Sequence, residues 1–158
     1  AVFFRLWYAF AKTEGTEGID MRPYRHRVNY YETDKMGITH HANYIHWMEE
    51  ARIDFLDQLG WGYDKLEALG VASPVLAVQC RYKAPTTFND RVDVTVSVLA
   101  YRGPRLTIGY EMRKEDGTLA LTGESEHCFL DREGKFLRLA KALPEFDAVL
   151  RGQVEEVC

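Results

Sequence analysis

A carboxylate and two imidazoles occur within a short stretch of this sequence, directly before a segment with helical spacing. Asp34 is followed by His40 and, seven positions after the aspartate, by His41. A carboxylate can activate a water molecule as a general base, or it can attack a carbonyl carbon itself as a nucleophile. This stretch is therefore the first candidate for catalytic chemistry.

A long amphipathic helix is predicted over residues 42–59, and its start adds a second chemical element. Apolar residues recur there at spacings of three and four; they are Tyr44, Trp47, Met48, Ala51, Phe55 and Leu59. The first N–H groups of a helix have no partner within it, and the helix dipole is positive at that end. We therefore expect the N-terminal residues His40, His41 and Ala42 to stabilise a negatively charged oxygen through their backbone N–H groups.

Alternation of apolar and polar residues predicts the strands that surround this helix. The clearest alternation covers residues 91–100, and it resumes over residues 106–112 after a Gly-Pro turn. Further strands are predicted over residues 24–30, 74–83 and 119–130, the second of them with one apolar face formed by Leu76, Val78, Cys80 and Tyr82. Short turns between neighbouring strands require antiparallel pairing. The sequence thus predicts an α+β domain in which an antiparallel sheet of five or six strands wraps around one long central helix.

Length and composition bound the domain organisation. With 158 residues and 46% hydrophobic composition, the chain is long enough for one compact domain and too short for two ordinary ones. We place this domain at residues 21–150, between an N-terminal extension over residues 1–20 and a C-terminal tail over residues 151–158. Short helices are predicted over residues 63–69 and from Pro144. The net charge of -4 gives no electrostatic reason to expect nucleic acid as the main partner.

The apolar part of the extension lacks the features of an export signal or a membrane anchor. Arg5 interrupts the apolar run over residues 2–11, and no basic segment precedes that run, so neither a signal peptide nor a membrane span is predicted. Met21 is the expected natural start. Three cysteines lack CxxC or other metal-ligand spacing, and we expect them to be reduced thiols of a cytosolic protein; they are Cys80, Cys128 and Cys158.

The stretch that contains the candidate groups also carries a family resemblance. Residues 31–52 read YETDKMGITHHANYIHWMEEAR. This run resembles the signature of the 4-hydroxybenzoyl-CoA thioesterase-like family of hotdog-fold acyl-CoA thioesterases, and it is especially similar to the Tol-Pal-cluster-associated branch. The resemblance extends more diffusely from about Met21 to Leu150. His40 departs from the pattern, because an aromatic residue commonly precedes the motif histidine, and this departure bears on the shape of the pocket.

The resemblance implies a reaction and an assembly. A thioester of coenzyme A or of an acyl carrier protein is hydrolysed to a free acid and a thiol without a cofactor, and the protein works in the cytoplasm. Asp34 acts as base or nucleophile, and His41 orients or transfers a proton near the substrate carbonyl. Dimers with joined sheets, often paired into tetramers, place the sites at subunit interfaces. Candidate substrate contacts are Tyr44 for the acyl group and, for the phosphates, Lys83, Arg91, Arg102 and Arg105.

Other interpretations of the same residues stay open. Asp34 also suits an ordinary turn, and His41 could be a capping or packed residue. Metal-dependent hydrolysis is an alternative because histidines gather here and His46 and Glu50 lie four apart on one helical face, although no HExxH motif accompanies them. A non-catalytic acyl-CoA-binding module is a second alternative, and a hotdog dehydratase is a third.

Overall fold

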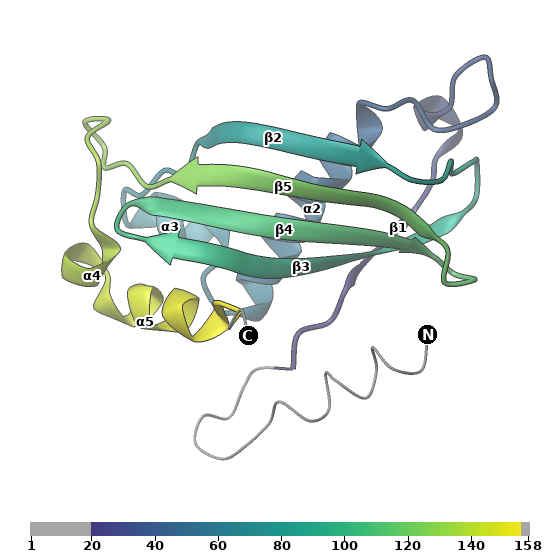
Figure 1. The fold of residues 1–158 in the computed structure, drawn as a ribbon. Helices are drawn as coiled ribbons and strands as arrows, with labels where there is room; N and C mark the ends of the chain where they lie inside the picture. The colour runs from purple at the N-terminus through teal and green to yellow at the C-terminus, as the bar shows by residue number, and fades with distance from the viewer. Residues whose placement is uncertain (1–19, 156–158) are drawn as a thin grey trace.

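One antiparallel sheet of five strands forms the frame of the molecule (Figure 1). The computed structural model describes residues 20–155. The strands are β1 (Tyr24–Arg27), β2 (Val75–Tyr82), β3 (Arg91–Arg102), β4 (Arg105–Lys114) and β5 (Leu119–Cys128). Their order across the sheet is β1-β3-β4-β5-β2, and all neighbours pair antiparallel. The meander β3-β4-β5 therefore forms the centre of the sheet, and β1 and β2 form its edges.

One long helix, α2 (Asn43–Gln58), packs against a face of this sheet (Figure 1). Its predicted apolar stripe is buried, and Trp47 and Met48 are at most 1% exposed. Val94 and Met112, from the sheet, are fully buried in the same core. The remaining helices are short: the 3-10 helix η1 (Tyr30–Glu32), α3 (Tyr63–Ala68), α4 (Leu139–Ala142) and α5 (Pro144–Gln153). The predicted α+β architecture with one long helix is thus confirmed.

Three details differ from the sequence-based expectations. The first strand ends at Arg27 and not near residue 30, because residues 30–32 turn into the 3-10 helix η1. Helix α4 was not predicted. The domain also continues past residue 150, where we placed its end: Val154 forms a parallel bridge with Val98, and the Glu155 N–H donates to the Val98 oxygen at 3.0 Å. The first residues of the predicted tail therefore belong to the fold.

Strand β2 is an edge strand with an exposed apolar face. Leu76, Val78 and Tyr82 are 47%, 39% and 50% exposed. This face lies on the helix side of the sheet, since Cys80 Sγ is 3.7 Å from Met48 Sδ of α2. An apolar edge strand that residues 20–155 leave uncovered is a preferred place for association with another sheet.

The remaining sequence-based predictions concern the termini and the cysteines. Residues 1–19, which make up nearly all of the predicted extension, lie outside the described residues, as does Cys158. Cys80 and Cys128 are free cysteines, and their expected reduced state in a cytosolic protein stays a prediction. Within residues 20–155, none of the helices combines the length and the apolarity needed to cross a membrane.

Candidate active site

Asp34 opens a tight turn that stands between two short extended segments. Thr33 and Thr39 form an antiparallel bridge, and the Asp34 N–H donates to the Ile38 oxygen at 2.9 Å. Gly37 closes the turn with a φ of 77°, a conformation that favours glycine. The Asp34 carboxylate accepts a hydrogen bond of 2.8 Å from the Met36 N–H and is half-buried. The turn thus holds this carboxylate in one orientation while leaving it accessible.

The N–H groups between the Asp34 turn and α2 are not all free to bind a substrate. The Thr39 N–H donates to the Thr86 oxygen, and the His40 N–H donates to the Glu32 oxygen, both at 2.8 Å. The Ala42 N–H donates to His40 Nδ1 at 3.2 Å. The His40 side chain is exposed and can move away from this N–H. Among the described residues, none accepts a hydrogen bond from the His41 N–H. Of the three predicted donors, His41 and Ala42 are therefore available, whereas the His40 N–H is already used.

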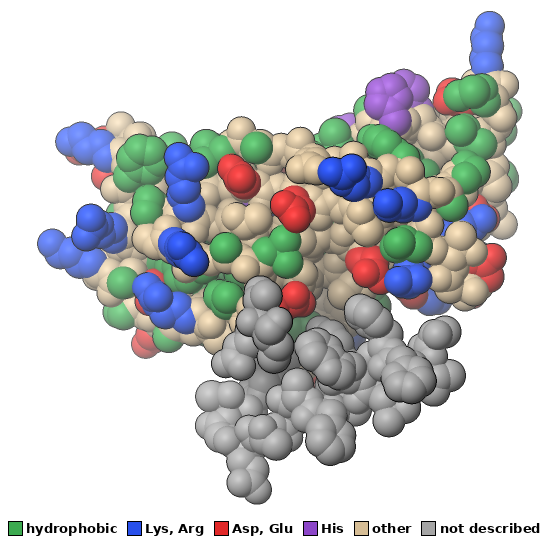
Figure 2. Space-filling model, in the orientation of Figure 1, with side chains coloured by type: hydrophobic (Ala, Val, Ile, Leu, Met, Phe, Trp, Pro, Cys, Tyr) green, Lys and Arg blue, Asp and Glu red, His purple; other side chains and the backbone are tan. Residues whose placement is uncertain are grey.

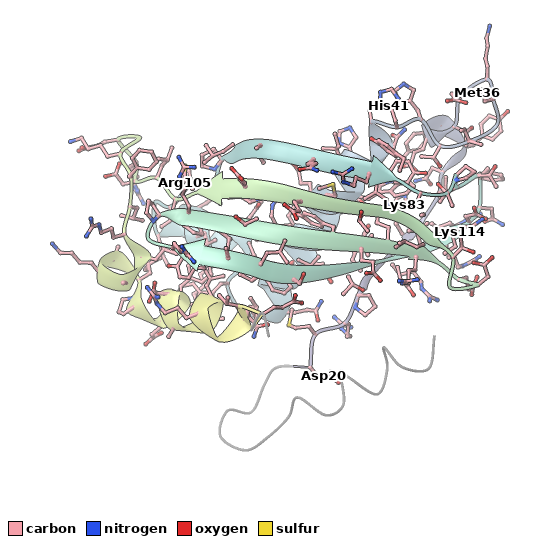
Figure 3. All side chains as sticks on the ribbon, in the orientation of Figure 1. Asp20, Met36, His41, Lys83, Arg105 and Lys114 are labelled. Atoms are coloured by element: carbon pink, nitrogen blue, oxygen red, sulfur yellow. The ribbon has the colours of Figure 1, made fainter. Side chains whose placement is uncertain are left out.

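The two adjacent histidines are exposed beside this turn. The rings of His40 and His41 stack with their centroids 4.2 Å apart. The main-chain oxygen of His41 accepts a hydrogen bond of 2.9 Å from Tyr82 Oη at the end of β2. Figure 3 shows His41 and Met36, from the Asp34 turn, at the same end of the molecule. The structure therefore brings the predicted catalytic and helix-start residues together.

Tyr44 is part of the core beneath this site within the described chain. It is 3% exposed, and its ring centroid lies 4.6 Å from that of Trp47 and 5.5 Å from that of Tyr82. Its hydroxyl lies 2.9 Å from Thr86 Oγ1, which also lies 2.6 Å from Thr39 Oγ1. In this arrangement Tyr44 supports the turn from below, and its predicted contact with an acyl group stays a prediction.

The predicted phosphate-binding cations are divided between the two ends of the sheet. Lys83 directly follows Tyr82 and so lies near His41, whereas Arg105 is at the opposite end (Figure 3). Arg102 pairs with Arg105 across the β3–β4 hairpin, and Arg91 begins β3. Basic and acidic side chains are interspersed on the face of the sheet seen in Figure 2, with no single basic patch on that face. Among the described residues, Lys83 and Arg91 therefore lie at the end of the sheet near the candidate catalytic residues, and Arg102 and Arg105 lie at the opposite end.

A buried glutamate next to the site was missed in the sequence. Glu32 is 5% exposed, and its carboxylate lies 2.8 Å from Trp47 Nε1, 2.7 Å from the Asn29 N–H and 2.9 Å from His26 Nε2. Burial alone would raise the pKa of this carboxyl, but the hydrogen bonds from His26, Trp47 and Asn29 outweigh it and hold the pKa below its ordinary value. The Asn-x-x-Glu spacing, in which a glutamate accepts the N–H three residues earlier, was the signal that could have identified it.

Comparison with known proteins assigns the chain to a family. The family model described as the thioesterase-like superfamily matches residues 28–154. The chain belongs to the thioesterase-like superfamily. It is 36% identical over 120 residues to the putative acyl-CoA thioesterase YneP of Bacillus subtilis, covering 75% of this chain and 87% of that protein. It is 29% identical over 93 residues to the acyl-CoA thioester hydrolase YbgC of Escherichia coli O157:H7, covering 59% of this chain and 69% of that one.

A solved thioesterase structure also has this fold. The DHNA-CoA thioesterase from Staphylococcus aureus superposes with a TM-score of 0.79 at 33% identity, covering 82% of this chain and 88% of that chain. The predicted hotdog fold is thus confirmed, and thioester hydrolysis is the class of activity into which the chain falls.

The histidines and carboxylates of this thioesterase-like protein do not form a metal site within residues 20–155. No group of three or more histidine, cysteine, aspartate or glutamate side chains there is arranged to hold a metal ion. His46 is exposed on α2. The carboxylate of Glu50 is engaged elsewhere, since it accepts the Tyr24 hydroxyl at 2.8 Å and lies 3.3 Å from His26 Nδ1.

A second polar region lies in the core beside the second half of α2. Arg52 donates to Tyr63 Oη at 3.0 Å and to Tyr110 Oη at 3.2 Å. Tyr110 Oη lies 2.7 Å from Ser125 Oγ, which lies 2.6 Å from His127 Nε2. Burial, together with the charge of Arg52, lowers the pKa of His127 to about 4. We call this set the Arg52 network. It shares no residue with the Asp34 turn.

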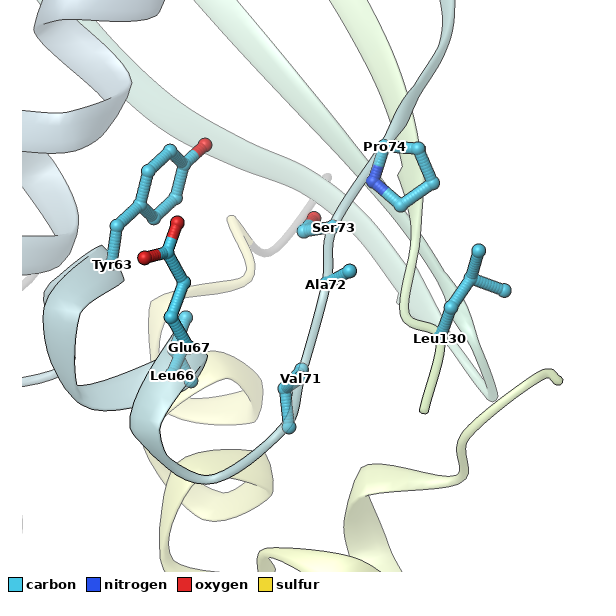
Figure 4. A pocket seen from close by; sticks show the side chains of 8 residues that line it. All are labelled: Tyr63, Leu66, Glu67, Val71, Ala72, Ser73, Pro74 and Leu130. Atoms are coloured by element: carbon cyan, nitrogen blue, oxygen red, sulfur yellow. The ribbon is translucent and has the colours of Figure 1, made fainter. Parts of the chain in front are cut away.

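A cavity of about 360 Å³ adjoins the Arg52 network through Tyr63 (Figure 4). Its other lining residues are Leu66, Glu67, Val71, Ala72, Ser73, Pro74 and Leu130, and most of them are apolar. The cavity is built from α3, the segment that leads into β2, and Leu130 after β5. Asp34 precedes the first residue of α2, whereas α3 follows its last residue. The 16 residues of α2 span about 24 Å at about 1.5 Å per residue, so this helix separates the cavity from Asp34 within one chain.

Proposed function

We propose that this chain is an acyl-CoA thioesterase, which hydrolyses a thioester to a free carboxylic acid and coenzyme A. The observation that carries the proposal is the accessible Asp34 carboxylate, held in a tight turn just before the start of α2 and before the His41 N–H group, which has no acceptor among residues 20–155. Such an arrangement offers an attacking or activating oxygen and a donor for the oxyanion within one short segment.

Each step of the reaction then has a group to perform it. Asp34 removes a proton from the attacking water, or it attacks the thioester carbonyl itself and forms an anhydride that water cleaves. The carbonyl oxygen becomes an oxyanion in the tetrahedral intermediate, and the N–H groups of His41 and Ala42 with the helix dipole stabilise it. The C–S bond breaks as the carbonyl re-forms, and the His41 side chain delivers a proton to the thiolate.

The working form in this proposal is a homodimer or a dimer of dimers. The exposed edge strand β2 supports it, because joining two such edges would extend the sheet and bring the second subunit beside the exposed Leu76, Val78 and Tyr82. We place the protein in the Tol-Pal-associated branch on the strength of the motif over residues 31–52, and in the cytoplasm because its cysteines lack CxxC or other metal-ligand spacing and are expected to be reduced thiols. Lys83, Arg102 and Arg105 remain the proposed phosphate contacts, and Tyr44 the proposed acyl contact. In such a dimer, cations from the far end of one sheet come from the partner.

A panel of thioesters tests the proposed activity. The purified chain is supplied with short-chain, long-chain and aromatic acyl-CoA esters, and free thiol is measured with a chromogenic disulfide. We expect turnover of at least one class, unaffected by a chelator. Binding of these esters without release of thiol would contradict the proposal and support the non-catalytic module. Turnover that a chelator abolishes and one added metal restores would support the metal-dependent hydrolase.

A further inference from the structure

The carboxylate of Glu32 connects three separate parts of the chain in the interior of the protein. It lies within hydrogen-bond distance of His26 Nε2 on β1, of Trp47 Nε1 on α2, and of the Asn29 N–H just before η1. His26 and Trp47 are themselves buried, at 7% and 0% exposure. A buried carboxylate is costly unless it is paired and hydrogen-bonded, so these contacts together fix the position of Glu32.

The main chain of the same residue holds the segment that carries the candidate oxyanion donors. The backbone oxygen of Glu32 accepts the His40 N–H at 2.8 Å and the Asn43 side-chain amide at 3.0 Å. The Asn43 amide also donates to the His40 oxygen at 3.1 Å. Glu32 is therefore bonded to the residue before His41 and to the first residue of α2, while Asp34 follows it by only two positions.

We propose that Glu32 is a positioning residue for the thioesterase site, and that its clamp on His26 and Trp47 sets the distance between the Asp34 carboxylate and the His41 N–H. The proposal rests on the proposed function, since it assigns a role within that site. Glu32 itself does not touch the substrate in this proposal. Displacement of a reacting group by about 1 Å can lower a catalytic rate about 100-fold, so loss of the clamp should act on turnover more than on substrate binding.

A control carboxylate is needed to distinguish positioning of the candidate site from general stabilisation of the core. Asp147 on α5 provides this control, because it is only 8% exposed. Its carboxylate accepts hydrogen bonds from Tyr101 Oη at 2.6 Å and from Arg151 Nε at 2.8 Å. Neither partner contacts the Asp34 turn. Asp147→Asn therefore removes a comparable charge and comparable hydrogen bonds without touching the candidate site.

Steady-state kinetics of Glu32→Gln and Asp147→Asn, on the thioester best hydrolysed by the full chain, test the proposal. We expect Glu32→Gln to lower kcat by about 10- to 100-fold with KM within about threefold. We expect Asp147→Asn to keep kcat within about twofold at a temperature where both variants are folded. Equal losses in both variants, or an unchanged kcat in Glu32→Gln, would overturn the proposal. If Glu32→Gln does not fold, Trp47→Phe removes one hydrogen bond of the clamp and should lower kcat in the same direction.

Two further measurements test the clamp, and the second of them does not depend on activity. In the Asp34→Asn background, adding Glu32→Gln should leave the residual rate unchanged within about twofold, because the group being positioned is already gone; a further large loss would contradict the proposal. Amide hydrogen exchange at His40 should be at least about tenfold faster in Glu32→Gln than in Asp147→Asn. Equal exchange would overturn the clamp. The exchange measurement tests the clamp even if the wild type hydrolyses no thioester. Absence of hydrolysis would refute the proposed function and leave the clamp to be decided by the exchange rates.

Discussion

Tyr82 Oη donates a hydrogen bond of 2.9 Å to the main-chain oxygen of His41, and this contact joins the edge strand β2 to the turn that leads into α2. Tyr82 is half exposed on the apolar face of β2, so the same residue belongs to the uncovered edge and to the wall of the candidate site. Association through β2 and the geometry of the candidate site are thereby physically connected.

Replacing the side chain of His41 should slow turnover without removing it. His41→Ala deletes the imidazole that would protonate the leaving thiolate, while its backbone N–H stays in place, so we expect a loss of about 10- to 100-fold in kcat. Tyr82→Phe is the control, because it removes the hydrogen bond to the His41 oxygen and leaves the imidazole. Kinetics of His41→Ala that match those of the wild type would demote His41 to a structural residue.

A charge on the apolar face of β2 should prevent association. Val78 is 39% exposed on the helix side of the strand, whereas its neighbour Gln79 points to the opposite face. Val78→Lys should convert the assembly to monomers and remove most activity, and Gln79→Lys should leave both unchanged. Sedimentation velocity at micromolar concentration gives the result. A Val78→Lys protein that keeps the wild-type mass and rate would rule out association through this face.

The Arg52 network should make stability fall in mild acid. His127 has its pKa lowered from 6.5 to about 4 in the folded state, so the unfolded chain binds the proton first as pH falls. The contribution of the buried, neutral His127 to the free energy of unfolding is therefore complete above about pH 6.5. It is lost progressively as the pH falls towards 4, by up to about 3 kcal/mol. Denaturant unfolding of the wild type and His127→Gln at several pH values isolates this effect. Parallel pH dependences for the two proteins would contradict it.

Glycine at the Asp34 turn should matter for activity beyond its effect on stability. Gly37 and Gly134 both have a φ of 77°, and a Cβ atom on either would meet no heavy atom within 4 Å. Alanine at either position therefore costs about 1 kcal/mol through backbone strain alone. We expect only Gly37→Ala to lower kcat, because it distorts the turn that fixes Asp34. Equal kcat values for the two variants would show that the turn tolerates the change.

The sequence predicted the fold where burial within one chain decides it. Alternation located β3 and β4 because one face of each strand packs under α2, and three- and four-residue spacing located the stripe around Trp47. The same alternation in β2 identified an apolar face correctly, yet Val78 is exposed there. A periodic pattern states which face is apolar, but it does not state whether the chain itself covers that face.

The sequence predicted the residues of the candidate site, but it did not predict the buried contacts that support them. The proximity of Asp34 and His41 follows from seven positions of separation across one turn. The burial of Glu32 does not, because it depends on Trp47, which lies 15 positions later and reaches back across the fold. The position of Arg105 at the far end of the sheet likewise depends on how the β3–β4 hairpin lies relative to α2.

Turnover by Asp34→Asn is the most direct test of the proposed mechanism. The side-chain oxygen of asparagine can accept the same hydrogen bond from the Met36 N–H, so the turn and the stability of the protein should be preserved. Loss of its carboxylate should lower kcat by about 1,000-fold or more on the best acyl-CoA ester, since neither base nor nucleophile remains. A folded Asp34→Asn protein that hydrolyses this ester at a rate near that of the wild type would contradict the account.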